Sequence, residues 1–208
     1  MRSDKKLRIS IITVWLFTIS GVIGIATGFE TQFLSLTALH LLVYLFLILW
    51  NATAWSKTAI NLLLPFLVGI FVEFLGVNYG LIFGEYAYGA NLGYKVLGVP
   101  ILIGVNWAIL VYCSAAIAKR ICPGWISCAI IAAIMMVFLD LIIEISAPRF
   151  DFWEFKNGVV PIQNYIGWFI VAIGIHLVYQ KLQRQFNFAL ALHIFMAIAL
   201  FFASFLYL

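Results

Sequence analysis

Charged residues are scarce in this sequence. Asp, Glu, Lys and Arg make up only 10% of its 208 residues, whereas 65% are hydrophobic and the mean hydropathy is +1.12. Soluble globular domains carry about 25% charged residues, so this composition excludes a soluble protein and indicates an integral membrane protein surrounded by the lipid bilayer. We attribute the net charge of +4 to orientation in the membrane and expect no nucleic-acid partner.

Cysteine and histidine are scarce as well. The cysteines are odd in number and two of them fall inside apolar runs: Cys113, Cys122 and Cys128. This pattern excludes a disulfide framework and matches no metal-ligand spacing. The histidines, His40, His176 and His193, lie on three different predicted helices, and a His-rich membrane oxygenase would need many more ligands. We therefore predict no metal site and interpret the histidines as core residues.

Long apolar runs take up most of the chain. Crossing the hydrocarbon core of a bilayer takes about 20 consecutive apolar residues. Such runs lie at roughly 9–28, 33–52, 58–77, 97–118, 124–146, 164–180 and 187–207. The first run is too long for a secretory signal and lacks a small-residue cleavage site, so it is expected to remain as an anchor. The sequence predicts an all-α fold, a polytopic membrane bundle of about seven transmembrane helices that forms one domain over residues 1–208.

The basic residues predict the orientation of this bundle, because cytoplasmic loops carry Lys and Arg in excess. With a cytoplasmic N-terminus, nine of the 12 basic residues fall on the inner side: Arg2, Lys5, Lys6, Arg8, Lys57, Lys119, Arg120, Lys181 and Arg184. The outer side then holds Lys95, Arg149 and Lys156. We expect a multi-pass protein of the cytoplasmic membrane with its N-terminus inside.

Three acidic residues interrupt the apolar runs near their predicted outer ends: Glu73, Asp140 and Glu144. One ionised group at the membrane centre costs about 2.5–3.5 kcal/mol on insertion scales, and no Lys or Arg lies within a predicted span to offset it. Burial and like charge both disfavour the ionised form, so at least one acid is expected to keep its proton while another stays ionised. Such a pair can act as acid and base. Alternatively, the acids bond helix ends, with Arg149 balancing Glu144.

The fifth run places two of these acids on a distinct helical face. Small and polar residues fall on one side of the helical wheel: Ala129, Ala133, Met136, Asp140, Glu144 and Ala147. The other sides are Ile, Leu, Val and Phe, so this stripe is expected to face protein or a cavity. Pro148 should end the helix, and the segment RFDFWEF that follows is typical of the membrane interface.

Glycine and asparagine add further candidate site residues. If the helix of the third run continued to residue 84, Gly76, Gly80 and Gly84 would share a face with Glu73 and admit a neighbouring helix or a flat ligand. Asn106 lies inside a predicted helix, whereas Asn164 is expected to be an N-cap. The tyrosines could be interfacial anchors: Tyr79, Tyr86, Tyr88 and Tyr94.

Several sequence blocks occur in order between residues 69 and 168. They read EFLGVNYGLIFGEYAY from Glu73, LGVPILIGVNW to Trp107, LDLIIE to Glu144, and VPIQNYIGW to Trp168. With Ala147 and Trp153, they closely resemble the membrane family of carotenoid biosynthesis proteins, which includes carotenoid 1',2'-hydratases and bisanhydrobacterioruberin hydratase. The outer runs are similar only in hydrophobicity.

The resemblance implies a hydratase in carotenoid biosynthesis. Its substrate would be a hydrophobic carotenoid with an acyclic ψ end group, whose terminal double bond gains water to give a tertiary alcohol without a cofactor. Asp140 or Glu144 would donate the proton, and the other acid and Glu73 would orient water or stabilise the cation. The end-group pocket would be lined by Tyr86, Tyr88, Asn106, Trp107, Asn164 and Trp168.

Two other functions would also suit membrane acids. A small proton-coupled transporter usually shows inverted repeats and helices broken at midplane, and neither is found in the sequence. A non-catalytic pigment-binding scaffold would use the glycine and aromatic surfaces but has little need of three acids. The sequence leaves the oligomeric state and the exact carotenoid open.

Overall fold

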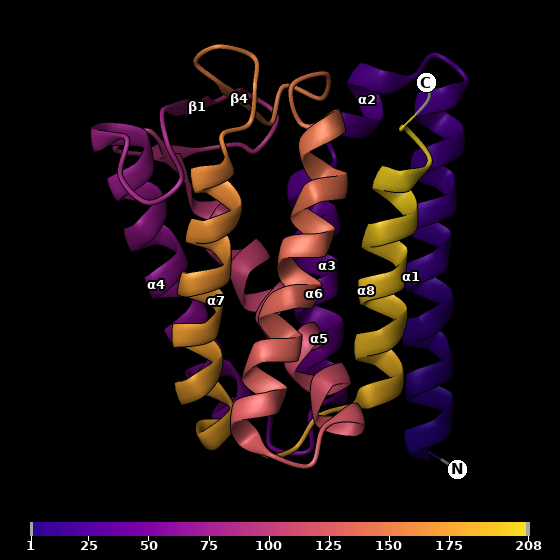
Figure 1. The fold of residues 1–208 in the computed structure, drawn as a ribbon. Coiled ribbons are helices and arrows are strands. Elements are labelled where there is room, and N and C mark those ends of the chain that lie inside the picture. The colour runs from indigo at the N-terminus through magenta and orange to yellow at the C-terminus, as the bar shows by residue number, and fades with distance from the viewer. Residues whose placement is uncertain (1, 207–208) are drawn as a thin grey trace.

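Residues 2–206 are described by the computed structural model of the protein, which is almost entirely helical (Figure 1). Eight helices occur within that range: α1 (Arg2–Ala26), α2 (Glu30–Leu34), α3 (Thr37–Asn51), α4 (Trp55–Tyr79), α5 (Ile101–Ile121), α6 (Trp125–Ser146), α7 (Ile162–Leu182) and α8 (Phe188–Ala203). The side chain of Arg2, counted in the predicted charge balance, and residue 207, the end of the last predicted span, lie outside the described part. The all-helical membrane class predicted from the sequence is confirmed.

Five of the helices are long and apolar enough to cross a membrane. They are α1, α4, α5, α6 and α7. The shortest of them, with 21 residues, measures about 32 Å at 1.5 Å per residue, which matches the roughly 30 Å hydrocarbon core. The helices α3 and α8 are apolar but shorter, with 15 and 16 residues. The protein is therefore a multi-pass membrane protein, while the count of seven spans stays a prediction.

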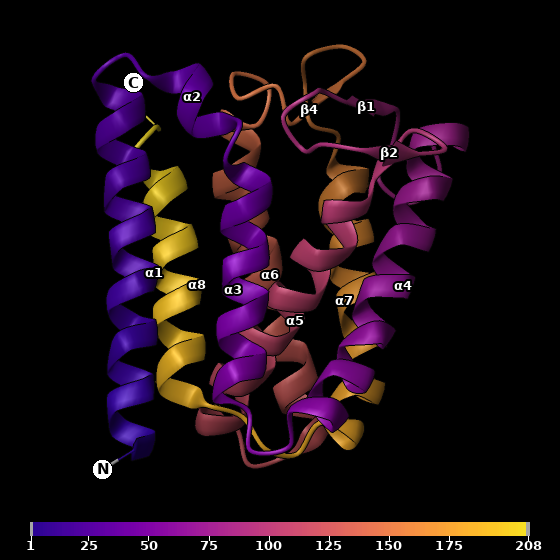
Figure 2. The same ribbon diagram turned by 180° about the vertical axis from the view of Figure 1, so that it is seen from behind.

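The bundle is organised around α5. Most of α5 is buried, whereas α1 exposes most of its surface. Figures 1 and 2 show α1, α3 and α8 together on one side of α5, and α4 and α7 together on the other. The small residues of α5 allow this close approach because they leave room for neighbouring helices: Ala108, Cys113, Ser114, Ala115 and Ala116 are all buried.

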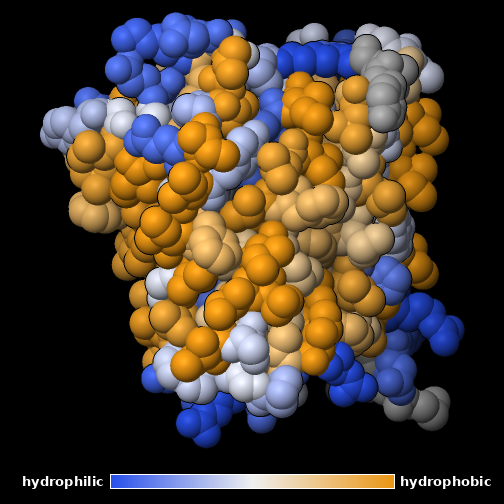
Figure 3. All heavy atoms as spheres, viewed as in Figure 1, coloured by the Kyte–Doolittle hydropathy of each residue, from blue (hydrophilic) through white to orange (hydrophobic). Residues whose placement is uncertain are grey.

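The outer surface is suited to lipid. Figure 3 shows a broad band of hydrophobic residues around the middle of the bundle and hydrophilic residues at both ends. Large apolar side chains such as Leu16, Phe71 and Ile145 are exposed on the surface of the helices. Exposing them to lipid has no hydrophobic cost. The direction in which the bundle crosses the membrane stays a prediction from its basic residues.

The two long connections fold over the same end of the bundle, here called the strand end. The α4–α5 connection contains β1 (Tyr86–Tyr88), β2 (Lys95–Val96) and β3 (Val99–Pro100), and the α6–α7 connection contains β4 (Trp153–Phe155). β1 and β4 pair antiparallel, with Tyr86 opposite Phe155 and Tyr88 opposite Trp153. Side chains alternate along a strand, so Tyr86 and Tyr88 point into the bundle while Ala87 is exposed.

The helix ends correct one expectation and confirm another. α4 stops at Tyr79, and Gly80 caps it in the left-handed conformation with φ 66°, which glycine adopts without steric cost. The prediction that Gly76, Gly80 and Gly84 share a helical face is therefore wrong. The prediction that α6 ends before Pro148 is confirmed, since its last residue is Ser146.

Candidate active site

A small hollow below the strand end brings together all the residues that the sequence analysis assigned to catalysis or to the end-group pocket. Its volume is about 20 Å³, enough for about one water molecule. The predicted residues among its lining are Glu73, Tyr86, Tyr88, Asn106, Trp107, Asp140, Glu144, Asn164 and Trp168. Lining residues that the sequence analysis did not select are Phe83, Ile103, Trp153 and Phe155. The fold therefore places these residues side by side around one space.

Glu73 is held in the hollow by three hydrogen-bond donors. Tyr88 donates to Oε2 at 2.6 Å, Trp107 donates from Nε1 to Oε1 at 3.0 Å, and Tyr86 also donates to Oε2. The side chain is buried, with 3% of the residue exposed. Hydrogen bonds from several donors favour a carboxylate, so this set of contacts is suited to negative charge at Glu73.

The two tyrosines are fixed as donors. Burial, and then the negative charge at Glu73, raise the pKa of Tyr86 and Tyr88 well above the usual range for a phenol. Both phenols therefore stay protonated at any physiological pH and keep their O–H bonds directed at Glu73. Tyr79 and Tyr94, by contrast, are exposed, which fits the anchor interpretation for those two residues only.

Asp140 and Glu144 are bridged by one amide. They lie one turn apart on α6, and Nδ2 of Asn164 donates to Asp140 Oδ2 at 2.8 Å and to Glu144 Oε1 at 3.2 Å. Trp153 donates from Nε1 to Glu144 Oε2 at 2.9 Å. Oδ1 of Asp140 accepts no hydrogen bond from any described residue. Asp140 is thus the least hydrogen-bonded of the three acids.

One prediction about a neighbouring residue is wrong, and one alternative is not supported. The N-cap of α7 is Pro161, and Asn164 lies in the first turn. Its side chain is therefore free to reach the acids of α6. Arg149 does not balance Glu144, because its guanidinium forms an ion pair with Glu30 at 2.9 Å. No Lys or Arg is found among the described residues that line the hollow.

The small and polar stripe of α6 explains how Asn164 comes so close. Every member of the stripe is buried, as the sequence predicted: Ala129, Ala133, Met136, Asp140, Glu144 and Ala147. Alanine side chains let a neighbouring helix approach closely, and α7 packs along α6 (Figure 1). The helix pattern thus determines which face of α6 carries the acids.

Aromatic rings wall the hollow. Trp107 and Trp168 stack with ring centroids 4.2 Å apart and planes 10° apart, and Phe83 lies within 6.4 Å of both rings. Gly69 makes room for this arrangement, since a Cβ atom there would lie 2.5 Å from Trp107. The stacked indoles present π faces, which attract cations.

The four residues that were not selected lie in the connections or on the apolar faces of helices. The segments YAY and WEF alternate inward and outward residues, and this period of two is a strand signal that could have placed Trp153 and Phe155 on the inner side. Phe83 and Ile103 carry no such signal, because an apolar residue in an apolar helix or loop is not distinctive.

The hollow holds no obvious metal ligands. Within residues 2–206, no group of three or more His, Cys, Asp and Glu side chains is placed to hold a metal ion. Two of the histidines bond elsewhere: His176 pairs with Ser114 at 3.2 Å, and His193 accepts a hydrogen bond from Trp15 at 3.0 Å. The polar groups among the described residues that line the hollow are carboxyl groups, amides, phenols and indole N–H groups.

Comparison with known proteins gives one match. A family model described as carotenoid biosynthesis protein matches residues 29–207. The match extends beyond the resembling blocks at 69–168 and includes α3 and α8. No curated protein and no solved structure matches the chain.

Proposed function

Because the chain belongs to the carotenoid biosynthesis protein family, we propose that it is a hydratase that adds water to the terminal double bond of an acyclic carotenoid end group without a cofactor. The observation that carries this proposal is the hollow, where three buried carboxyl groups surround a space for one water between aromatic walls. Hydrating an alkene takes an acid, a stabilised cation and a base. The lining residues offer a group for each.

Asp140 is assigned as the proton donor. Two buried carboxyl groups bridged by one amide resist ionising together, so the pair is suited to holding one proton between them. Asp140 lines the hollow, and its Oδ1 accepts no hydrogen bond from the described residues, so this oxygen is assigned to carry the proton that is transferred to the alkene. Transfer of the proton to the less substituted alkene carbon forms a C–H bond and leaves a tertiary cation.

Glu73 and the stacked indoles are assigned to that cation. The Glu73 carboxylate is already held by its three donors, so it needs no reorganisation when positive charge forms beside it. The faces of Trp107 and Trp168 add cation–π attraction. The same rings exclude bulk water, which would otherwise weaken these electrostatic interactions.

Glu144 is assigned as the base. A water molecule in the hollow attacks the cation, forms the C–O bond and gives up a proton to the Glu144 carboxylate. Transfer of a proton from Glu144 to Asp140 then restores the starting state, so one water is consumed and no redox change occurs. Asn164 fixes both carboxyl groups through its amide, and Asn106 lines the same space.

A second hollow with a polar rim adjoins the site at Tyr86 and is the proposed source of water. Tyr86 also lines a second, open hollow at the strand end, together with Asn78, Glu85 and Lys156. Glu85 and Lys156 are exposed and form an ion pair with each other. Water would thus arrive from the polar side of Tyr86. An apolar substrate would arrive from the lipid.

The proposal is tested by expression in a host that accumulates lycopene. The extracted pigments should include products that have gained the mass of water, as chromatography and mass analysis would show. In deuterated water the product should also carry a deuterium on carbon, since the first step forms a C–H bond. Unchanged pigments in cells that contain the inserted protein would refute hydration of this substrate.

Two further measurements, of pigment binding and of proton movement, separate the alternatives. A pigment-binding scaffold would bind lycopene without changing its mass, whereas a proton-coupled transporter would acidify or alkalinise proteoliposomes when its solute is added. Either result, without a hydrated product, would replace the hydratase proposal.

Gly76 provides a test of the hollow's geometry. A Cβ atom at this position would lie 2.6 Å from the Tyr86 hydroxyl, so Gly76→Ala should displace Tyr86 from Glu73 and slow hydration roughly tenfold or more. Gly174→Ala on α7 is the matched control, because nothing lies within 4 Å of its Cβ position. Initial rates in membranes with equal amounts of protein would make the comparison, and equal rates would mean that the Tyr86–Glu73 contact is dispensable.

A further inference from the structure

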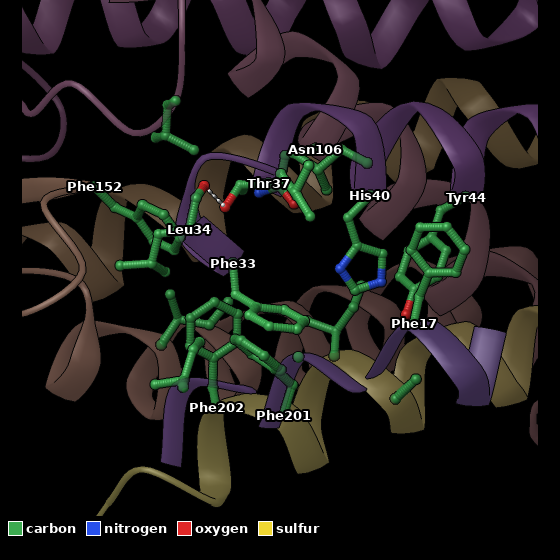
Figure 4. A pocket seen from close by; sticks show the side chains of 18 of the residues that line it. Phe17, Phe33, Leu34, Thr37, His40, Tyr44, Asn106, Phe152, Phe201 and Phe202 are labelled. Atoms are coloured by element: carbon green, nitrogen blue, oxygen red, sulfur yellow. Dashed lines mark hydrogen bonds between the residues drawn. The ribbon is translucent and has the colours of Figure 1, made fainter. Parts of the chain in front are cut away.

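A larger cavity lies beside the hollow. Its volume is about 270 Å³, and its walls come from α1, α2, α3, α5, α6, α8 and the connection that carries β4. Figure 4 shows phenyl rings around it, among them Phe33, Phe152, Phe201 and Phe202. No Asp, Glu, Lys or Arg is among the described lining residues. A few polar side chains, such as Thr37, His40 and Asn106, interrupt these apolar walls, so the cavity suits an uncharged and mainly apolar occupant.

The glycines of α1 give these rings their space. A Cβ atom at Gly24 would lie 2.0 Å from the Phe33 ring, and one at Gly21 would lie 3.2 Å from Phe201. Both rings line the cavity, so the glycines allow them to pack against the α1 backbone and leave the space between the helices open. The packing of α1 against these rings therefore maintains the cavity.

The cavity and the hollow share a boundary. Ile103, Asn106 and Trp153 line both spaces. Trp153 also donates its hydrogen bond to Glu144, so the boundary lies within contact distance of an acid. The side chain of Asn106 forms no hydrogen bond with another residue in the described range. The hollow itself has room for about one water, so the tip of a chain in the cavity reaches the acids only when side chains at this boundary move aside.

The rim of the cavity faces the lipid. Leu16 on α1 is 62% exposed and Leu36, just before α3, is 48% exposed. Both side chains line the cavity and belong to apolar segments, α1 and the N-cap region of α3. An apolar molecule dissolved in the bilayer can therefore enter between α1 and α3 without crossing water.

We infer that this cavity holds the segment of the conjugated polyene next to the reacting end group, and that the carotenoid enters it sideways from the bilayer between α1 and α3. Pockets for drug-sized ligands measure about 300–1,000 Å³, so a cavity of about 270 Å³ accommodates only part of a carotenoid. The rest of the molecule stays in the lipid, and the two ends react in separate binding events. This inference rests on the proposed function.

Cavity-filling variants test it. Leu41 and Ala197 line the cavity, whereas their neighbours Leu42 and Met196 are exposed on the outer surface. Leu41→Trp and Ala197→Phe should lower the lycopene retained by the purified protein and raise the KM for hydration about tenfold, because the larger side chains occupy space that the polyene needs. Leu42→Trp and Met196→Phe should change neither quantity. Bound lycopene is measured by visible absorbance per protein, and Leu41→Phe serves as a smaller change if Leu41→Trp unfolds.

The outcomes separate this inference from the proposed function. Lycopene retained by the wild type and lost from the cavity variants, with no hydrated product from any of them, would support the cavity and refute the hydratase. Normal retention and KM in both cavity variants would refute the cavity. Purified protein that carries a phospholipid chain and excludes lycopene would refute it as well.

The time course tests the claim about separate ends. Lycopene has two identical acyclic ends, so a product hydrated at one end should accumulate first and be released before the product hydrated at both ends appears. Formation of the doubly hydrated product without a free singly hydrated intermediate would mean that both ends react in one binding event, contrary to the inference.

Discussion

Asp140→Asn is expected to stop hydration of lycopene while leaving the protein inserted in the membrane and able to bind pigment. Asparagine keeps the shape of the side chain, and its Oδ1 can still accept the hydrogen bond from Asn164, but it has no acidic proton to give. Loss of a general acid costs about 100- to 10,000-fold in rate, and Glu144, the other carboxyl group of the pair, is assigned to the base step and cannot fill both roles. The rate is measured in membranes by mass analysis of the pigments.

Glu30→Gln is the control for this variant. Glu30 pairs with Arg149 near the same end of the bundle but does not line the hollow. An exposed ion pair contributes at most about 1 kcal/mol, so the control should insert and hydrate as the wild type does. If Asp140→Asn kept full activity, Asp140 would not be the donor, and Glu144→Gln would become the variant to examine for that role.

Glu73→Gln is expected to lower kcat about 100- to 1,000-fold with little change in KM. Removing one preorganised electrostatic group from a transition state costs about that much, and the positive charge on carbon exists only after protonation. The amide can still accept from Trp107, and the two tyrosine hydroxyls can turn to accept from its NH2 group. The substitution therefore removes charge while the shape of the site is preserved.

Tyr88→Phe gives the comparison that isolates charge from hydrogen bonding. It removes one donor to Glu73 but leaves the carboxylate with Tyr86 and Trp107, so its loss of kcat should be clearly smaller than that of Glu73→Gln. Equal losses of kcat in the two variants would show that the hydrogen-bonded position of the Glu73 side chain matters more than its negative charge. Full activity of Glu73→Gln would remove Glu73 from the chemistry.

The helical part of the site was predictable from the sequence because a helix has a fixed period. The spacing of Ala133, Asp140 and Glu144 determines that they share a face, whatever the neighbouring helices are. No Lys or Arg lies in the apolar runs, so the three acids were expected to lie together and share a proton. Glu73 does line the same hollow as Asp140 and Glu144. The wider membrane class followed from composition alone.

The connections were less predictable, since their conformation depends on contacts between distant segments. Pairing of β1 with β4 places Trp153 beside Tyr88, and neither segment is a strand without its partner. Arg149 pairs with Glu30, a residue far away in the sequence. Asn164 does not cap α7 because the helix begins two residues earlier, at Ile162, with Pro161 at the N-cap.

The separation of the acids from the cavity walls has a consequence for how this fold could diversify. All three carboxyl groups lie on α4 and α6, whereas α1, α3 and α8 form most of the wall of the larger cavity. Substitutions at positions such as Gly21 or Leu41 would retune which pigments are admitted without disturbing the reactive groups. Under the proposed function, selectivity and reactivity would then be set largely by different helices, and a few changes in α1, α3 or α8 would alter which pigment is accepted.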